Sequence, residues 1–438
     1  MLVVFSYSMA PTLIFYGCWP SLSSTHRKSL FLNKIQLKKL GGEIMNLTLN
    51  TILKLYPVSI KKDKKNYIIE DTISGDFYEM PKICVDAIEF INQKWTLGQI
   101  EAELKQLYPD EEVDVINFAK QLIDFGLVKE IDGIELKVEK SNLLMSGFSW
   151  ISPRFSRLFF HKHSNMIFIC LIMINLLLFL TNTELIPYYE DLFLFDSLIF
   201  NMVTFSFISL VMLVIHEFGH VLAARSFNLP AKLGVGHRFF LVVFETDLTY
   251  AWRLSPKERN TLYIAGLYFE QFILFIVLLI KLFITVRDPI LSGILNFIIL
   301  DLFYKAIYQC CFFMKTDIYY IFENSSGCYN LLENSKTYLR QLFSTSRDKG
   351  QELFENETRI VKVYSIFYII GGMLMITLLI FYIIPQMYTF LKQAIMNLVN
   401  PVDPTNIIDS VLFLGLFFIT SSLLLYSLIK ENRRIPSS

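Results

Sequence analysis

The spacing of apolar residues divides the chain into two parts with different architectures. Between about residues 150 and 434, long runs of Phe, Leu, Ile, Val and Met are separated by short charged segments. Runs of this kind are typical of helices that cross a lipid bilayer. We expect six spans, at residues 166–181, 198–227, 262–284, 290–314, 363–387 and 407–429. The sequence therefore predicts a polytopic α-helical membrane protein over residues 150–434.

Residues 46–148 carry shorter patterns, which are typical of a domain in water. Alternating apolar and polar residues predict a first hairpin, and Asp132-Gly133 between two apolar runs predicts a last one. The expected strands lie at residues 58–60, 67–69, 75–79, 127–131 and 134–136. Strands therefore stand at both ends of this part.

Three helices are expected between these strands. Pro81 opens the first and Thr96 caps the second, while a stripe of apolar residues over 115–123 marks the third, which ends at Gly126. Strands, three helices and a terminal hairpin in this order predict a small α+β winged-helix domain over residues 46–148.

Composition supports this division and narrows the classes of partner. Hydrophobic residues make up 53% of the 438-residue chain, which is too many for an ordinary soluble protein. The formal net charge is zero, and the third helix of the N-terminal domain follows the acidic segment 110–114 with Lys120 as its one basic residue. A winged helix that reads DNA needs a basic recognition helix. We therefore expect no nucleic acid among the partners.

The first 44 residues fit neither part. They begin with an apolar run, but the basic residues follow it instead of preceding it as they would in a signal peptide. The segment Gly41-Gly42-Glu43-Ile44-Met45 can be encoded by a bacterial ribosome-binding site followed by a start codon. We therefore expect translation to start at Met45 rather than at Met1, which makes residues 1–44 a mis-assigned or disordered extension.

The distribution of Lys and Arg predicts the orientation in the membrane. Basic residues gather before the first span, after the second, after the fourth and in the C-terminal tail, whereas the opposite loops are poorer in them and 184–191 is acidic. Basic loops tend to stay on the cytoplasmic side. We therefore expect a multi-pass protein of the bacterial plasma membrane, with both termini and the winged-helix domain in the cytoplasm.

The second span contains the segment His216-Glu217-Phe218-Gly219-His220. Residues four apart lie on one face of a helix, so the two imidazoles can share one Zn²⁺ while Glu217 takes a proton from water. A carboxylate and two imidazoles cost several kcal/mol in a bilayer unless partners offset them. The plainer alternative is a pair of hydrogen-bonded histidines and a glutamate that reaches toward the interface. The apolar span around the segment favours the metal site.

A third ligand has to come from another helix at the same depth. Asp317 lies at the expected cytoplasmic end of the fourth span, near the level of His220. Asp301 comes 16 residues earlier, roughly 24 Å away along a helix, and is expected to pair with Lys305 instead. We therefore predict that Asp317 completes the metal site.

The His-Glu-x-x-His segment resembles that of the site-2 protease family of intramembrane zinc metalloproteases. Residues 312–320 also resemble a subgroup of that family whose second motif runs Pro-Phe-Leu-Lys-x-Asp-Gly-Tyr-Tyr, with its Asp completing the zinc site. Phe312 and Ile318 replace the Pro and the Gly of that motif. The positions that match are Phe313, Lys315, Asp317, Tyr319 and Tyr320. The resemblance implies that residues 231–250 form a membrane-embedded β-hairpin, which holds the substrate as an extra strand.

The N-terminal domain resembles the PqqD-like domain, which binds leader peptides during the maturation of ribosomally made peptides. The resemblance lies in the order of elements and in the segments Tyr78-Glu79-Met80, Trp95-Thr96-Leu97 and Phe125-Gly126-Leu127. It implies that a leader peptide adds a strand to the sheet edge and lies against the third helix. A domain that serves only to fold against the membrane part is the plainer alternative.

Together these features predict a membrane-embedded zinc metalloendopeptidase that cleaves a ribosomally synthesised precursor peptide. In this prediction His216, His220 and Asp317 hold Zn²⁺, Glu217 is the general base, and the N-terminal domain grips the leader of the precursor. The lipid bilayer is a further partner, and an exporter or another maturation enzyme would be one as well.

Two other classes of protein stay open at this point. A catalytically inactive relative would bind the peptide at the membrane for other enzymes or an exporter, and its metal content separates it from an enzyme. A transporter or immunity protein would use the histidines to gate a proton or metal path. That path needs polar residues through the whole bundle, and deep in the spans only Asp301, Lys305, Glu270 and Gln271 stand out. Of these, Glu270 and Gln271 are expected to join neighbouring helices rather than to bind metal.

Overall fold

The computed structural model describes residues 47–64, 66–136, 147–238, 241–284, 286–328, 331–343, 358–401 and 403–432. The expected start at Met45 and the assignment of residues 1–44 lie outside these residues. The described chain forms two compact units. We refer to the described residues of 147–248 and 257–432 as the helical unit, and to those of 47–136 together with Thr249–Pro256 as the sheet unit.

Six helices of the described chain are long and apolar enough to cross a membrane, which confirms the expected number. The continuous helix Thr358–Val399 counts as one of them and contains a π-helical segment, η4. Their bounds are α6 (Ser164–Thr181), α7 (Leu198–Ser226), α8 (Pro256–Phe283), α9 (Pro289–Gln309), α12 (Thr358–Leu378) with η4 (Leu379–Ile383) and α13 (Ile384–Val399), and α14 (Pro404–Asn432). By length and composition, these helices suit a membrane-spanning protein.

Two of the spans end elsewhere than the apolar pattern predicts. The fourth ends at Gln309 rather than at 314, because the chain turns after Gln309 and starts a new helix, α10 (Asp317–Ser326). The fifth continues to Val399 rather than ending at 387. Pro385 lies in the first turn of α13, directly after the π-helical segment, so its missing N–H does not end the helix there.

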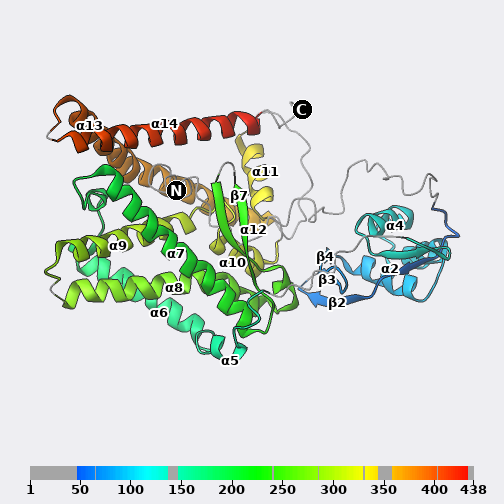
Figure 1. The fold of residues 1–438 in the computed structure, drawn as a ribbon. Coiled ribbons are helices and arrows are strands. Elements are labelled where there is room, and N and C mark those ends of the chain that lie inside the picture. Colours follow the sequence, from blue (N-terminus) through cyan, green and yellow to red (C-terminus); the bar gives the residue numbers. More distant parts are fainter. Residues whose placement is uncertain are drawn as a thin grey trace. The chain divides into compact units, whose positions relative to one another are not determined.

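A two-stranded hairpin follows α7 in the chain. Its strands β7 (Lys232–Arg238) and β8 (Leu241–Asp247) pair antiparallel, with Leu233 opposite Thr246. Figure 1 shows the hairpin beside α7. The hairpin expected over residues 231–250 is therefore present. The remaining described elements of the helical unit are α5 (Pro153–Ser156), η1 (Thr183–Leu185), η2 (Tyr189–Leu192), α10 and α11 (Leu331–Phe343).

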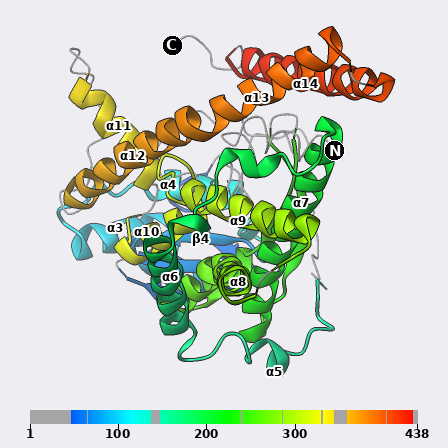
Figure 2. The same cartoon turned by 90° about the vertical axis from the view of Figure 1, so that its left-hand side faces the viewer.

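The N-terminus of α7 is fixed by a side chain from α14. The Asp409 carboxylate accepts hydrogen bonds from Oγ of Ser197 and from the backbone N–H groups of Leu198 and Ile199, at 2.7, 2.7 and 3.1 Å. These N–H groups have no partner inside the helix, and negative charge is favourable at this helix end. Further along, α7 packs against α9, α13 and α14 (Figure 2) through a buried apolar cluster that includes Phe205, Phe297, Phe390 and Phe413. The helix is thereby a rigid support for its polar residues.

The sheet unit has the element order that the sequence predicts, with one additional strand, β1, in front. Two three-stranded antiparallel sheets, β1-β5-β6 and β2-β3-β4, accompany three helices around one apolar core. The Thr96 hydroxyl accepts from N–H of Gln99 at 3.3 Å, and the Gln99 side chain accepts from N–H of Thr96 at 2.9 Å, which caps α3 as expected. The bounds are β1 (Leu53–Leu55), β2 (Val58–Asp63), β3 (Asn66–Asp71), β4 (Phe77–Met80), α2 (Lys82–Asn92), α3 (Leu97–Leu107), α4 (Val115–Asp124), β5 (Val128–Ile131) and β6 (Ile134–Glu135).

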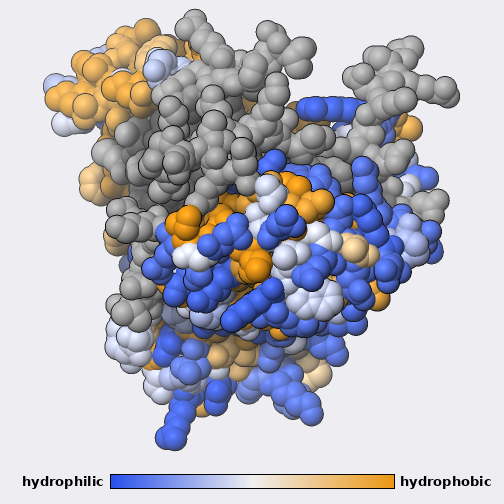
Figure 3. Space-filling model, turned by 90° about the vertical axis from the view of Figure 1, so that its right-hand side faces the viewer, coloured by the Kyte–Doolittle hydropathy of each residue, from blue (hydrophilic) through white to orange (hydrophobic). Residues whose placement is uncertain are grey.

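The surface of the sheet unit is mainly polar on the face that Figure 3 shows, with only a small group of apolar residues. The unit includes Thr249–Pro256, a segment that follows β8 in the chain. There Nε of Arg253 donates to Glu70 at 2.9 Å, and the rings of Tyr250 and Phe77 meet edge to face. A polar surface over an apolar core is typical of a domain in contact with water.

Candidate metal centre

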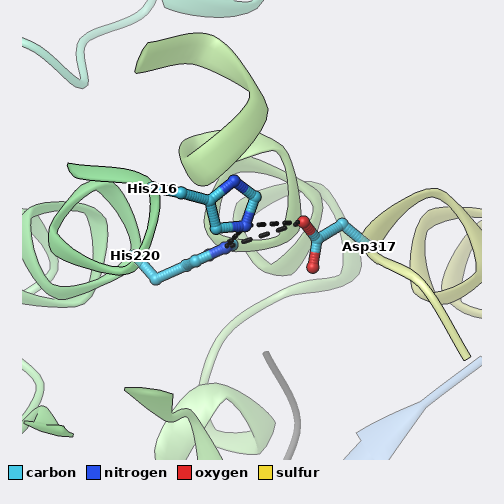
Figure 4. Close-up of side chains that lie close together, drawn as sticks. All are labelled: His216, His220 and Asp317. Atoms are coloured by element: carbon cyan, nitrogen blue, oxygen red, sulfur yellow. Dashed lines mark hydrogen bonds and ion pairs between the residues drawn. The ribbon is translucent and has the colours of Figure 1, made fainter. Parts of the chain in front are cut away.

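His216 and His220 lie on one face of α7, and both side chains are fully buried. Their Nε2 atoms are 3.2 Å apart (Figure 4), as the four-residue spacing predicts. Nδ1 of His220 lies 2.8 Å from the backbone oxygen of Leu262 in α8. A carbonyl oxygen only accepts hydrogen bonds, so Nδ1 of His220 carries a proton, and Nε2 is the nitrogen atom left to bind a metal ion. A histidine that binds a metal ion through Nε2 typically donates its other ring N–H in this way.

Asp317 brings a third donor to the same point from the first residue of α10. Its Oδ2 lies 3.1 Å from Nε2 of His216 and 3.8 Å from Nε2 of His220, and the side chain is buried with them (Figure 4). Asp301 lies apart from this group: its carboxylate is 2.7 Å from Nζ of Lys305, the expected pair, and also accepts from Oγ of Ser209 at 2.6 Å. The three predicted ligands therefore lie together, and Asp301 pairs with Lys305 and Ser209 instead.

The three donor atoms have the spacing that one four-coordinate ion requires. Bonds of about 2.0–2.1 Å at tetrahedral angles place neighbouring ligand atoms about 3.4 Å apart. The separations here are 3.1, 3.2 and 3.8 Å, on both sides of that value. Three protein ligands leave one of four positions open, which is typical of catalytic rather than structural zinc sites. The residues present therefore fit an ion of this kind.

The charge of Asp317 also suits a metal ligand. Burial acts to raise the pKa of its carboxyl group, but the imidazoles of His220 and His216 outweigh burial and hold this pKa below its usual range. The carboxylate is therefore anionic at neutral pH, which is the form that binds a cation.

Gln309, the last residue of α9, holds Asp317 from two sides. Its side-chain N–H donates to Oδ2 of Asp317 at 3.1 Å, and its Oε1 accepts from the backbone N–H of Asp317 at 3.1 Å. The Thr316 hydroxyl donates to the backbone oxygen of Gln309 at 3.2 Å, so the intervening turn is closed as well. Neither Phe312 nor Ile318 is among the described residues with positive φ. The turn therefore forms without the Pro and Gly of the motif that the segment resembles.

The Glu217 carboxylate contacts the β-hairpin. Its Oε2 accepts from the backbone N–H of Thr246 at 2.9 Å and from the Thr246 hydroxyl at 2.8 Å. Both residues are buried. This contact could not be predicted from the sequence, because Thr246 is 29 residues away and lies on a strand. The hairpin thus fixes the carboxylate that lies next to His216 in the chain.

A glycine in α8 makes room for the histidines. A Cβ atom on Gly266 would lie 2.5 Å from Cε1 and 2.6 Å from Cδ2 of His216, closer than real Cβ contacts occur. Gly219 of α7 is similarly confined, because its Cβ would come within 2.7 Å of the backbone oxygen of Ala265. Glycines at these two positions therefore allow α7 and α8 to approach closely at the metal centre.

The two polar residues of the third span that were expected to join helices both do so. The Asn175 side chain in α6 donates to Oε1 of Gln271 at 3.0 Å. Oε1 of Glu270 lies 3.1 Å from Nδ1 of His216 in α7. Neither belongs to the group of possible metal ligands found among the described residues, which contains only His216, His220 and Asp317.

Comparison with known proteins identifies no relative of this chain. No model of a protein family, no curated protein and no solved structure matches the chain. The function is therefore argued from the centre itself.

Proposed function

We propose that the chain is a membrane-embedded zinc metalloendopeptidase, similar to the site-2 proteases, that cleaves a ribosomally synthesised precursor peptide. The observation that carries the proposal is the convergence of His216, His220 and Asp317, from two separate helices, at one buried point. Glu217, a carboxylate in the position of a general base, lies next to them on α7. A pair of histidines that served packing alone would not need an anionic third donor at this distance.

Each residue has a separate task in this proposal. His216, His220 and Asp317 hold Zn²⁺, which when bound acidifies water and polarises the scissile carbonyl group. Glu217 takes a proton from the attacking water and gives it to the leaving amine. Thr246 orients Glu217 through two hydrogen bonds. Burial of the centre strengthens these interactions by excluding bulk water.

The β7–β8 hairpin is the proposed support for the substrate. An extended peptide gains affinity and a fixed register when it adds a strand to an exposed sheet edge. Thr246 of β8 contacts Glu217, so a strand bound along the hairpin would run close to the general base. This arrangement would place a peptide bond without requiring the substrate itself to cross the membrane.

For the sheet unit we propose a PqqD-like winged-helix domain that binds the leader of the precursor. Its order of strands and helices, its two three-stranded sheets and its polar surface support this assignment. Binding the leader would raise the concentration of precursor near the metal centre. We place the protein in the bacterial plasma membrane with both termini in the cytoplasm, as the distribution of Lys and Arg favours.

The experiment is a comparison of metal content and peptide cleavage in purified protein. The wild type and the variant Glu217→Gln would be reconstituted in lipid nanodiscs, analysed for zinc, and mixed with short peptides encoded beside the gene. We expect about one zinc ion per chain in both, and cleavage by the wild type alone, because Gln cannot accept the proton. Glu333→Gln, on α11, is a control in which both properties are retained.

The possible results separate the classes of protein. Equal cleavage by the wild type and Glu217→Gln would show that Glu217 is not the general base. Peptide binding by a wild type that carries no zinc and cleaves nothing would identify an inactive peptide-binding protein instead.

A further inference from the structure

The two imidazoles of the centre have different partners on their outer nitrogen atoms, and one helix supplies both. Nδ1 of His220 faces the backbone oxygen of Leu262, and Nδ1 of His216 faces the carboxylate of Glu270, at 2.8 and 3.1 Å. Leu262, Gly266 and Glu270 follow one another at intervals of four residues, so they lie on one face of α8. On successive turns, this face of α8 therefore offers the carbonyl group of Leu262 to His220, leaves room for the ring of His216 at Gly266, and offers the carboxylate of Glu270 to His216.

The carboxylate of Glu270 is buried and lies next to Nδ1 of His216. Glu270 is 3% exposed, so its charge is removed from water. The separation from Nδ1 of His216 is that of an ion pair, and Oε1 has no aligned hydrogen bond within the described residues. A buried carboxylate is costly unless a positive group lies next to it. An imidazole whose Nε2 binds a divalent cation carries positive charge and offers Nδ1–H toward Glu270, which satisfies this need.

We propose that Glu270 is a positioning residue for the metal centre, one that holds His216 through Nδ1 so that its Nε2 faces the metal ion. This inference rests on the proposed metal centre and adds a fourth side chain to its design. The carboxylate selects the Nδ1–H tautomer of His216 and orients the ring, while the carbonyl group of Leu262 does the same for His220. Outer partners of this kind typically change metal affinity by about 10–100-fold.

The test measures the affinity for metal, independently of peptide cleavage. Wild type, Glu270→Gln and Glu270→Leu would be purified in nanodiscs, stripped of metal and titrated with Zn²⁺ against a chromophoric chelator, and with Co²⁺ while its visible absorption is recorded. We expect Glu270→Leu to bind Zn²⁺ about 100-fold more weakly and Glu270→Gln about tenfold more weakly, because Gln accepts from Nδ1–H but carries no charge. The Co²⁺ spectrum of Glu270→Leu should change as the ring of His216 loses its orientation.

Gln271→Leu is the matched control. It also replaces a polar side chain by an apolar one in α8, but it removes a contact with Asn175 rather than with an imidazole. We expect it to keep the affinity and the Co²⁺ spectrum of the wild type. A loss as large as that of Glu270→Leu would show that helix packing, not the orientation of His216, sets the affinity.

The remaining outcomes are also decisive. Wild-type affinity and an unchanged spectrum in Glu270→Leu would overturn the inference while leaving the proposed enzyme intact. If Glu270→Leu does not fold, Glu270→Gln carries the test, and wild-type affinity in that variant would overturn it. A wild type that binds neither Zn²⁺ nor Co²⁺ would remove the proposed function itself and this inference with it.

Discussion

The substitution Gly266→Ala tests how closely the metal centre depends on the approach of α8 to α7. The new Cβ atom would lie 2.5 Å from Cε1 and 2.6 Å from Cδ2 of His216, and closer still to Nε2. Ordinary contact begins at 3.4 Å. The backbones of α7 and α8 are also close at Gly219, near the next turn of α7, where an added Cβ atom would lie 2.7 Å from the backbone oxygen of Ala265.

The size of the effect follows from these distances. To restore ordinary contact, the ring of His216 has to move by about 1 Å, which exceeds the roughly 0.5 Å within which a functional site must be held. Overpacking of this kind costs about 1–3 kcal/mol. Because the strain falls on a ligand, we expect it to appear as weaker metal binding, by about tenfold per 1.4 kcal/mol. The helix itself gains from the change, since Ala is favoured over Gly inside helices by about 1 kcal/mol.

The assay is a chelator titration of Zn²⁺ with thermal unfolding of the same samples. Gly372→Ala is the control, because Gly372 also lies inside a long helix but nothing is within 4 Å of its added Cβ atom. We expect Gly372→Ala to bind Zn²⁺ like the wild type, and Gly266→Ala to bind it roughly 5- to 150-fold more weakly. Equal affinity in the two alanine variants would refute the reasoning, because the ring of His216 would then tolerate the methyl group.

Three further predictions concern buried contacts of the helical unit. Replacing Asp301 alone by Leu should lower stability in detergent by about 3–5 kcal/mol, whereas the double variant with Lys305→Met should recover it, since both charges are then removed; thermal unfolding that shows no recovery would contradict this. Gln309→Ala should weaken Zn²⁺ binding by about 10–100-fold, because two hydrogen bonds to Asp317 disappear. A chelator titration measures this affinity, and an unchanged value would show that Gln309 does not position Asp317. Thr246→Val should lower kcat roughly 10- to 150-fold with the metal content retained, because a hydrogen bond to a charged group contributes about 1.5–3 kcal/mol, and Thr246→Ser should restore the rate. A fall in zinc content would point to a structural role instead.

The convergence of His216, His220 and Asp317 could be predicted from the sequence. The spacing of the two histidines is local, and the level of Asp317 in the membrane follows from its position along the chain. Four-residue spacing places His216 and His220 together on any helix, whatever surrounds them. The choice of Asp317 needed only the count of residues along the fourth span and the rule that a ligand must lie at the same level. Asp317 does lie beside the two histidines, although the span ends at Gln309, five residues before the predicted end. The apolar residues that follow Gln309 concealed the turn, since hydrophobicity does not reveal where a helix stops.

The outer contacts could not be predicted, because each joins elements that are distant in the sequence. Thr246 reaches Glu217 from a strand, and a threonine in an alternating segment looks like any other strand residue. The need for a glycine at position 266 is visible only in the structure, where the ring of His216 lies beside it. Glu270 did carry a signal, because a carboxylate in an apolar span requires a partner. The sequence indicated that a partner exists but did not identify which helix provides it.

The charges of the centre give a physical reason for a cation that is independent of any motif. Three carboxylates, those of Glu217, Glu270 and Asp317, are buried around two imidazoles. Each buried ion costs several kcal/mol even after the surroundings relax. Hydrogen bonds from Thr246 and Gln309 reduce that cost, but they supply no positive charge. The proposed divalent ion between the imidazoles and Asp317 would supply it, and the same ion would make Glu270 a favourable partner for His216 rather than an unfavourable buried charge.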